Sequence, residues 1–164
     1  MRLTKVKLLL AAAASTLLLP LVAGCRVGYP FRGPGYDSTR GVIHPGASTQ
    51  VFIAITQGDV EAGKGRHFST QLDSVLGTMK AHDGLIGYAV RKQLFGPRVW
   101  TMSAWIDRES MELFAASPEH RRAIAEGGIA PASFSSAFTY VDVGQVPLSW
   151  SQAEQLLEAE PKRE

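Results

Sequence analysis

The feature of the sequence that most constrains its fold is an amphipathic segment enclosed by strand-like runs. Residues 51–56 are rich in residues that favour strands, and this run ends at Gly58. Apolar residues then recur at helical spacing from Phe68 to Met79, while polar residues lie off that stripe. The pattern predicts a strand followed by a helix that buries one face, and Gly84 is the glycine stop expected after such a helix.

A second group of signals follows in the next sixty residues. The runs 85–94 and 99–106 flank a compact turn and predict an antiparallel hairpin. Asp107 is a predicted N-cap for a second helix, which restarts at Ser117-Pro118 because serine caps helices and proline suits the first helical position. Residues 133–143 predict the last strand.

The order of these elements defines the expected fold. Ser151 and Glu154 have capping-box spacing and predict a C-terminal helix after the last strand. The order β-α-β-β-α-β predicts an α+β, ferredoxin-like split βαβ fold, with a four-stranded antiparallel sheet and two helices on one face. We expect the other face to be uncovered in a monomer, and an apolar sheet face of that size implies a partner.

The N-terminal region predicts a lipoprotein signal peptide over residues 1–24. Three cations precede an apolar run over 8–19, and Val22-Ala23-Gly24 leads to Cys25, the only cysteine. This arrangement resembles a bacterial lipobox, in which the cysteine is joined to diacylglycerol and begins the mature protein. The run is short for a membrane span of roughly 20 residues. An ordinary secretory signal with a chance cysteine, or a short membrane anchor, is the alternative.

Composition divides the remaining chain and excludes several classes of function. Residues 25–48 contain many glycines and prolines and no apolar period, which predicts a flexible tether. An α+β domain over 49–146 and a C-terminal helix within 147–164 follow. The formal net charge of +2 falls to −1 without residues 1–24, so we expect no nucleic-acid partner. The histidines lack metal-ligand spacing, so no metal site is expected.

Several segments together resemble the antibiotic-biosynthesis-monooxygenase-like (ABM-like) domains of the dimeric α+β barrel superfamily. The likeness covers roughly residues 50–145. The segments that carry it are Phe68–Leu72, Gly84–Tyr88, Trp105–Asp107, Met111–Phe114 and Ser117–Arg121. The resemblance implies a homodimer and, in its quinol-oxidising members, a monooxygenase that needs no cofactor.

Three residues are candidates for a site on this domain. His120 is the candidate catalytic residue, because an imidazole titrates near neutrality and can accept a proton. The resemblance makes Trp105 a wall of the substrate pocket, and Tyr88 would orient a phenolic substrate. Each also has a purely structural interpretation, as a surface histidine or as a packed aromatic. Trp100 lies an odd number of residues from Trp105 and is predicted on the opposite sheet face, in the dimer interface.

Two functions of different kinds follow from these observations. The first is a membrane-anchored, cofactor-independent monooxygenase acting on a small electron-rich aromatic such as a quinol. The second is a non-catalytic envelope module that binds a small apolar ligand or a partner protein. Haem degradation is disfavoured because Ala123 and Ile124 stand where that subgroup has its iron-ligating histidine. In either case we expect a lipid-anchored protein on the extracytoplasmic side of a bacterial cell envelope.

Overall fold

The computed structural model describes residues 25–159, so the predicted signal peptide lies outside the described residues. The predicted β-α-β-β-α-β order is confirmed, with the second helix divided in two. The elements of this unit are β4 (Gln50–Asp59), α2 (Gly65–Met79), β5 (Leu85–Gln93), β6 (Arg98–Trp105), α3 (Arg108–Ala115), α4 (Pro118–Glu126) and β7 (Ser135–Asp142). Within residues 25–159, no helix is both long enough and apolar enough to cross a bilayer.

The prediction of a flexible tether over 25–48 is wrong. Residues Arg26–Arg32 form strand β1, which pairs antiparallel with β5, and the short strands β2 (Tyr36–Asp37) and β3 (Gly41–Val42) pair with each other. The sheet therefore has five strands, in the order β1-β5-β6-β4-β7. A Cβ atom on Gly28 would lie 2.2 Å from the Val90 carbonyl oxygen, so glycine here permits close strand pairing.

Helix caps fix the second half of the domain. The Asp107 side chain accepts a hydrogen bond from the Ser110 amide at 2.7 Å, and Ser117 caps α4 in the same way, as predicted. The capping box of helix α5 (Trp150–Ala159) lies two residues before the predicted pair Ser151 and Glu154. This box joins Ser149 and Gln152, whose side chains each accept a hydrogen bond from the other residue's amide.

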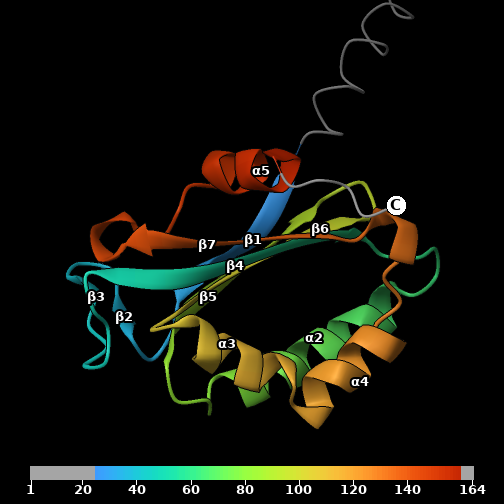
Figure 1. The fold of residues 1–164 in the computed structure, drawn as a ribbon. Coiled ribbons are helices and arrows are strands. Elements are labelled where there is room, and N and C mark those ends of the chain that lie inside the picture. Colours follow the sequence, from blue (N-terminus) through green and yellow to red (C-terminus); the bar gives the residue numbers. More distant parts are fainter. Residues whose placement is uncertain (1–24, 160–164) are drawn as a thin grey trace, which may run out of the picture.

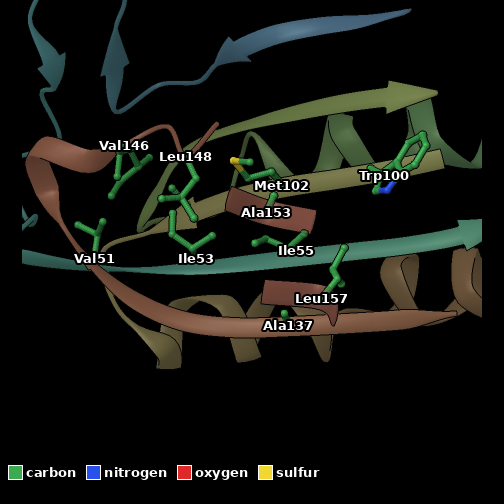
Figure 2. Packing of buried hydrophobic residues seen from close by; sticks show 12 residues of the cluster. Val51, Ile53, Ile55, Trp100, Met102, Ala137, Val146, Leu148, Ala153 and Leu157 are labelled. Atoms are coloured by element: carbon green, nitrogen blue, oxygen red, sulfur yellow. The ribbon is translucent and has the colours of Figure 1, made fainter. Parts of the chain in front are cut away.

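Helices cover both faces of the sheet (Figure 1). Helices α2, α3 and α4 lie on one face, and α5 lies across the other, where Ala153 and Leu157 are buried. The prediction of an uncovered sheet face is therefore wrong, because the chain supplies its own cover. The cluster on the α5 face is shown in Figure 2; its sheet residues include Val51, Ile53, Ile55, Trp100, Met102 and Ala137.

A buried cation fastens α5 to the sheet. The Arg91 guanidinium lies 4.5 Å from the ring centroids of both Trp100 and Trp150, and it forms a 2.6 Å ion pair with Glu154 of α5. Burial lowers the pKa of Arg91, although Glu154 opposes that effect. Trp100 thus lies on the α5 face and Trp105 on the other, as their spacing predicted.

Candidate ligand-binding site

A cavity of about 700 Å³ lies between β1, the end of β5 and the beginning of α2. Its apolar wall combines residues from four elements of the fold. The wall includes Val27 and Tyr29 from β1, Phe68 and Leu72 from α2, Val90 from β5 and Val99 from β6. A cavity with an apolar wall and a few polar groups can hold a small molecule.

Charged groups lie at the rim of this cavity. Lys92 contributes an exposed ammonium group from β5, and Glu61 and Asp73 contribute exposed carboxylates from the loop before α2 and from α2 itself. Arg98 does not add a free charge nearby, because it forms a bidentate ion pair with Asp59. The rim of the cavity can therefore contact a polar part of a ligand while the wall contacts its apolar part.

Tyr88 lies beside the cavity, in the core. Its side chain is 2 % exposed, and its hydroxyl has no hydrogen-bond partner among the described residues. Val90, two residues further along β5 on the same sheet face, lines the cavity wall. An unpaired buried hydroxyl is costly, so Tyr88 is a donor that a ligand could satisfy by entering more deeply.

Trp105 is fully buried under the helices. Its indole stacks on Phe114 of α3 with ring centroids 5.3 Å apart, and its Nε1 donates a hydrogen bond to the Ser103 hydroxyl at 3.0 Å. Ser103 pairs with Tyr88 across the two strands. Trp105 and Tyr88 therefore share one apolar cluster.

His120 contacts this cluster from α4. Its ring lies 4.8 Å from that of Phe114, and Nδ1 lies 3.1 Å from the Ala115 carbonyl oxygen. Burial lowers the pKa of His120, while the bond to Ala115 raises it by a smaller amount. A neutral ring that donates from Nδ1 to this carbonyl keeps Nε2 as a proton acceptor.

Hydroxyl groups continue from Ser103 along the same sheet face. The hydroxyls of Thr56 and Thr101 lie 2.7 Å apart on the two central strands. Both side chains are half-buried, whereas the residues around Trp105 are fully enclosed. This part of the helix-facing surface is therefore polar and reachable by solvent.

The three predicted site residues lie near the cavity but do not line it. Trp105 and His120 both contact Phe114, and Tyr88 belongs to the same buried cluster. The helical stripe signalled Phe68 and Leu72, but no local pattern signalled the wall from β1. Among residues 25–159, no group of three or more histidine, cysteine or acidic side chains is placed to hold a metal ion.

The structure is a ferredoxin-like α+β domain with a cavity between its sheet and helix α2. Residues 51–126 match the family model described as antibiotic biosynthesis monooxygenase, ABM. This part of the chain is therefore similar to ABM domains. No curated protein matches the chain in sequence.

Solved structures agree with the fold. A conserved protein from Methanosarcina mazei Go1 is similar with a TM-score of 0.51 and 15 % identity, over 56 % of this chain and 92 % of that one. Protein SO0527 from Shewanella oneidensis has the same TM-score and identity, over 58 % of this chain and 95 % of that one. At this identity the likeness establishes the shared fold only.

Proposed function

We propose that this chain is a lipid-anchored envelope protein whose ABM domain binds an electron-rich, quinol-type aromatic molecule and acts as a monooxygenase without a cofactor. The observation that carries the proposal is the cavity with an apolar wall, most of whose lining residues belong to the region that matches the ABM family. A flat aromatic substrate suits the wall formed by Phe68, Leu72 and Val90.

The proposed chemistry needs few groups from the protein. A base removes a proton from the substrate, and the resulting anion supplies electrons to dioxygen. One oxygen atom joins a ring carbon as a carbonyl group, the other leaves as water, and the substrate loses four electrons. The protein binds the substrate, accepts the proton and excludes water from the intermediate.

His120 is the proposed base, and Tyr88 is the proposed orienting donor. The lowered pKa keeps His120 neutral at pH 7, so its Nε2 can accept a proton. The Tyr88 hydroxyl has no protein acceptor among the described residues and is available to a substrate oxygen. Because neither residue lines the cavity, the substrate must extend beyond Val90 towards the aromatic cluster in the reactive complex.

Oxygen uptake by the purified full-length protein tests this proposal. General base catalysis contributes roughly 100- to 10,000-fold, so His120→Ala should lower turnover of a quinol or anthrone at least about tenfold. His67→Ala, which removes an exposed histidine of α2, is the matched control. If the His120 variant keeps full activity, the protein is still a monooxygenase, but the assignment of His120 as its base is wrong.

A binding module is the second candidate function, and one observation favours it. The described residues that line the cavity include no histidine, and their carboxylates Glu61 and Asp73 lie at the exposed rim. A cavity with this lining can bind a ligand, but within residues 25–159 it offers no enclosed acid or base for a reaction. Calorimetric binding of an aromatic ligand with no oxygen uptake would establish this function in place of the first.

Anchoring through Cys25 belongs to the same proposal. The lipobox-like sequence before Cys25 supports it, and stable attachment requires more than one acyl chain. The intact mass of the membrane-extracted protein should show the acyl groups, and Cys25→Ala should yield an unprocessed or soluble species. A Cys25 variant that stays in membranes at the wild-type mass would contradict the assignment.

We also propose a homodimer, with an interface that differs from the sequence-based expectation. Helix α5 already covers the second face of the sheet, so that face is not free to pair as a whole. The edge strand β7 instead presents Phe138 and Tyr140, which are 44 % and 50 % exposed and pack on Phe52. A second copy would bury these aromatic rings.

A further inference from the structure

We propose that the edge formed by β1 and the turn after β5 lies on the lipid surface, and that the cavity takes an amphiphilic aromatic ligand directly from the bilayer. The inference rests on the lipid anchor and the aromatic ligand proposed above. It adds the orientation of the domain and the source of its ligand.

The position of Cys25 leaves no length of chain for a tether. Its carbonyl oxygen accepts a hydrogen bond from the Leu94 amide at 2.8 Å, and β1 begins at the next residue. Val27, which lines the cavity, follows two residues after Cys25, a span of at most about 7 Å in extended chain. An uncleaved apolar segment would reach the domain at the same point, so both kinds of anchor bring the membrane to this edge.

Four exposed apolar side chains lie on this edge of the domain, beside the exposed Arg26. Val27, Tyr29, Leu94 and Phe95 have exposed fractions of 39 %, 52 %, 46 % and 62 %. Three of them, all except Phe95, also line the cavity. Aliphatic and aromatic side chains beside a lipid anchor are suited to the boundary between headgroups and acyl chains.

Two cations lie along this apolar edge. Lys92 is exposed on the same edge, and the Arg32 guanidinium lies 4.9 Å from the Tyr29 ring centroid. These cations suit anionic phospholipid headgroups. Glu61 and Asp73 line the cavity from the loop before α2 and from α2, where Lys64 and Arg66 are also exposed.

This orientation selects a class of ligand. A molecule with an aromatic head and an apolar tail can place its head against Leu72 and Val90 while the tail stays among the lipids. The cavity volume of about 700 Å³ is sufficient for such a head. A strictly water-soluble aromatic molecule would gain nothing from a mouth on the membrane.

The orientation can be tested with spin labels on the full-length lipoprotein in vesicles of phosphatidylethanolamine and phosphatidylglycerol. Phe95→Cys carries the label on the proposed membrane edge. Ile43→Cys is the control, because Ile43 is 43 % exposed and its amide bonds to Gly35, which pairs with Ile86 at the opposite end of β5. We expect the Phe95 label to collide with oxygen dissolved in lipid, and the Ile43 label to collide with a water-soluble nickel complex.

The source of the ligand can be tested with a photoreactive benzophenone that carries a long alkyl tail and is dissolved in the same vesicles. We expect crosslinks to peptides that contain Leu72 or Val90. A Leu72→Trp variant, which fills part of the wall, should reduce this labelling at least about tenfold. A short, water-soluble benzophenone is the matched control and should label the cavity less.

Each outcome bears on a different part of the proposal. Equal water exposure of the Phe95 and Ile43 labels, or equal labelling by both benzophenones, overturns the inference even if quinol oxidation is observed. Lipid contact at Phe95 together with selective labelling supports it even if no oxygen is consumed, in which case only the monooxygenase activity is wrong. If the intact mass shows neither acyl groups nor an uncleaved N-terminal segment, the protein has no anchor and the proposed membrane orientation is wrong.

Discussion

At the scale of single residues, the buried cluster that contains Tyr88, Trp105 and Phe114 has two polar atoms that differ in hydrogen bonding. The Trp105 indole nitrogen is satisfied by Ser103, whereas the Tyr88 hydroxyl has no partner among the described residues. A buried hydroxyl without a partner costs roughly 1–3 kcal/mol. A side chain retained at that cost is better explained by a role with a ligand than by packing alone.

Replacing Tyr88 by phenylalanine separates these two roles. Tyr88→Phe removes the unpaired hydroxyl and keeps the ring, so the free energy of unfolding should stay unchanged or rise by up to about 1 kcal/mol. Ligand affinity should fall, because the donor is lost. Urea denaturation and calorimetry measure the two quantities. A destabilised variant with normal ligand affinity would show that the hydroxyl serves the fold.

His120 predicts a dependence of stability on pH. Its pKa is lowered below the usual value near 6.5, so the unfolded chain binds the proton more readily than the folded one. The stability that neutral His120 contributes is therefore present in full above about pH 6.5. It declines as the pH falls below that value, because the unfolded chain takes up the proton first. His120→Gln keeps a donor for the Ala115 carbonyl and should reduce this decline.

Thermal unfolding of both proteins between pH 7.5 and pH 5.5 measures the effect, with His67→Gln as a control at an exposed histidine. We expect wild type to lose more stability over this interval than His120→Gln. Parallel curves for wild type and the His120 variant would show that His120 is not responsible.

At the scale of elements, local signals predicted more of the fold than long-range pairing did. Asp107 and Ser117 were predictable as caps because each acts on an amide three residues away. Strand β1 was not, because its Gly- and Pro-rich sequence resembles a linker and its hydrogen bonds go to β5, more than fifty residues distant. The cavity could not be predicted for the same reason, since one of its walls comes from β1.

Helix α5 is held on the sheet by an ion pair as well as by apolar packing. Arg91 is 9 % exposed and depends on Glu154 for its ion pair. Glu154→Gln should therefore destabilise the protein by about 1–3 kcal/mol, less than a fully buried pair because the Glu154 side chain is 27 % exposed. Glu158→Gln, at an exposed site on the same helix, should change stability by less than about 0.5 kcal/mol. Urea denaturation compares them, and equal effects would contradict this role.

At the scale of the whole molecule, the two edges of the sheet have different surroundings. The β1 edge lies beside Cys25 and the cavity, while the β7 edge carries exposed aromatic rings with no cover in the described chain. A second copy at the β7 edge would cover its unpaired backbone groups, and a membrane beside β1 would keep other chains away from that edge. Edge strands left open invite unwanted pairing, so this arrangement also limits aggregation.

The β7 edge therefore predicts where the homodimer forms. A stable interface buries on the order of 800 Å² per partner, and aromatic residues at its centre contribute most of the affinity. Tyr140→Asp combined with Phe138→Asp should weaken dimerisation by about 2 kcal/mol or more, because two carboxylates would be buried without partners. Phe95→Asp, the same kind of change at one exposed ring near the opposite edge, should leave the dimer intact. Sedimentation equilibrium of the full-length protein in density-matched detergent measures the association. A wild-type monomer at tens of micromolar would contradict the dimer, and a double variant that dimerises normally would move the interface away from β7.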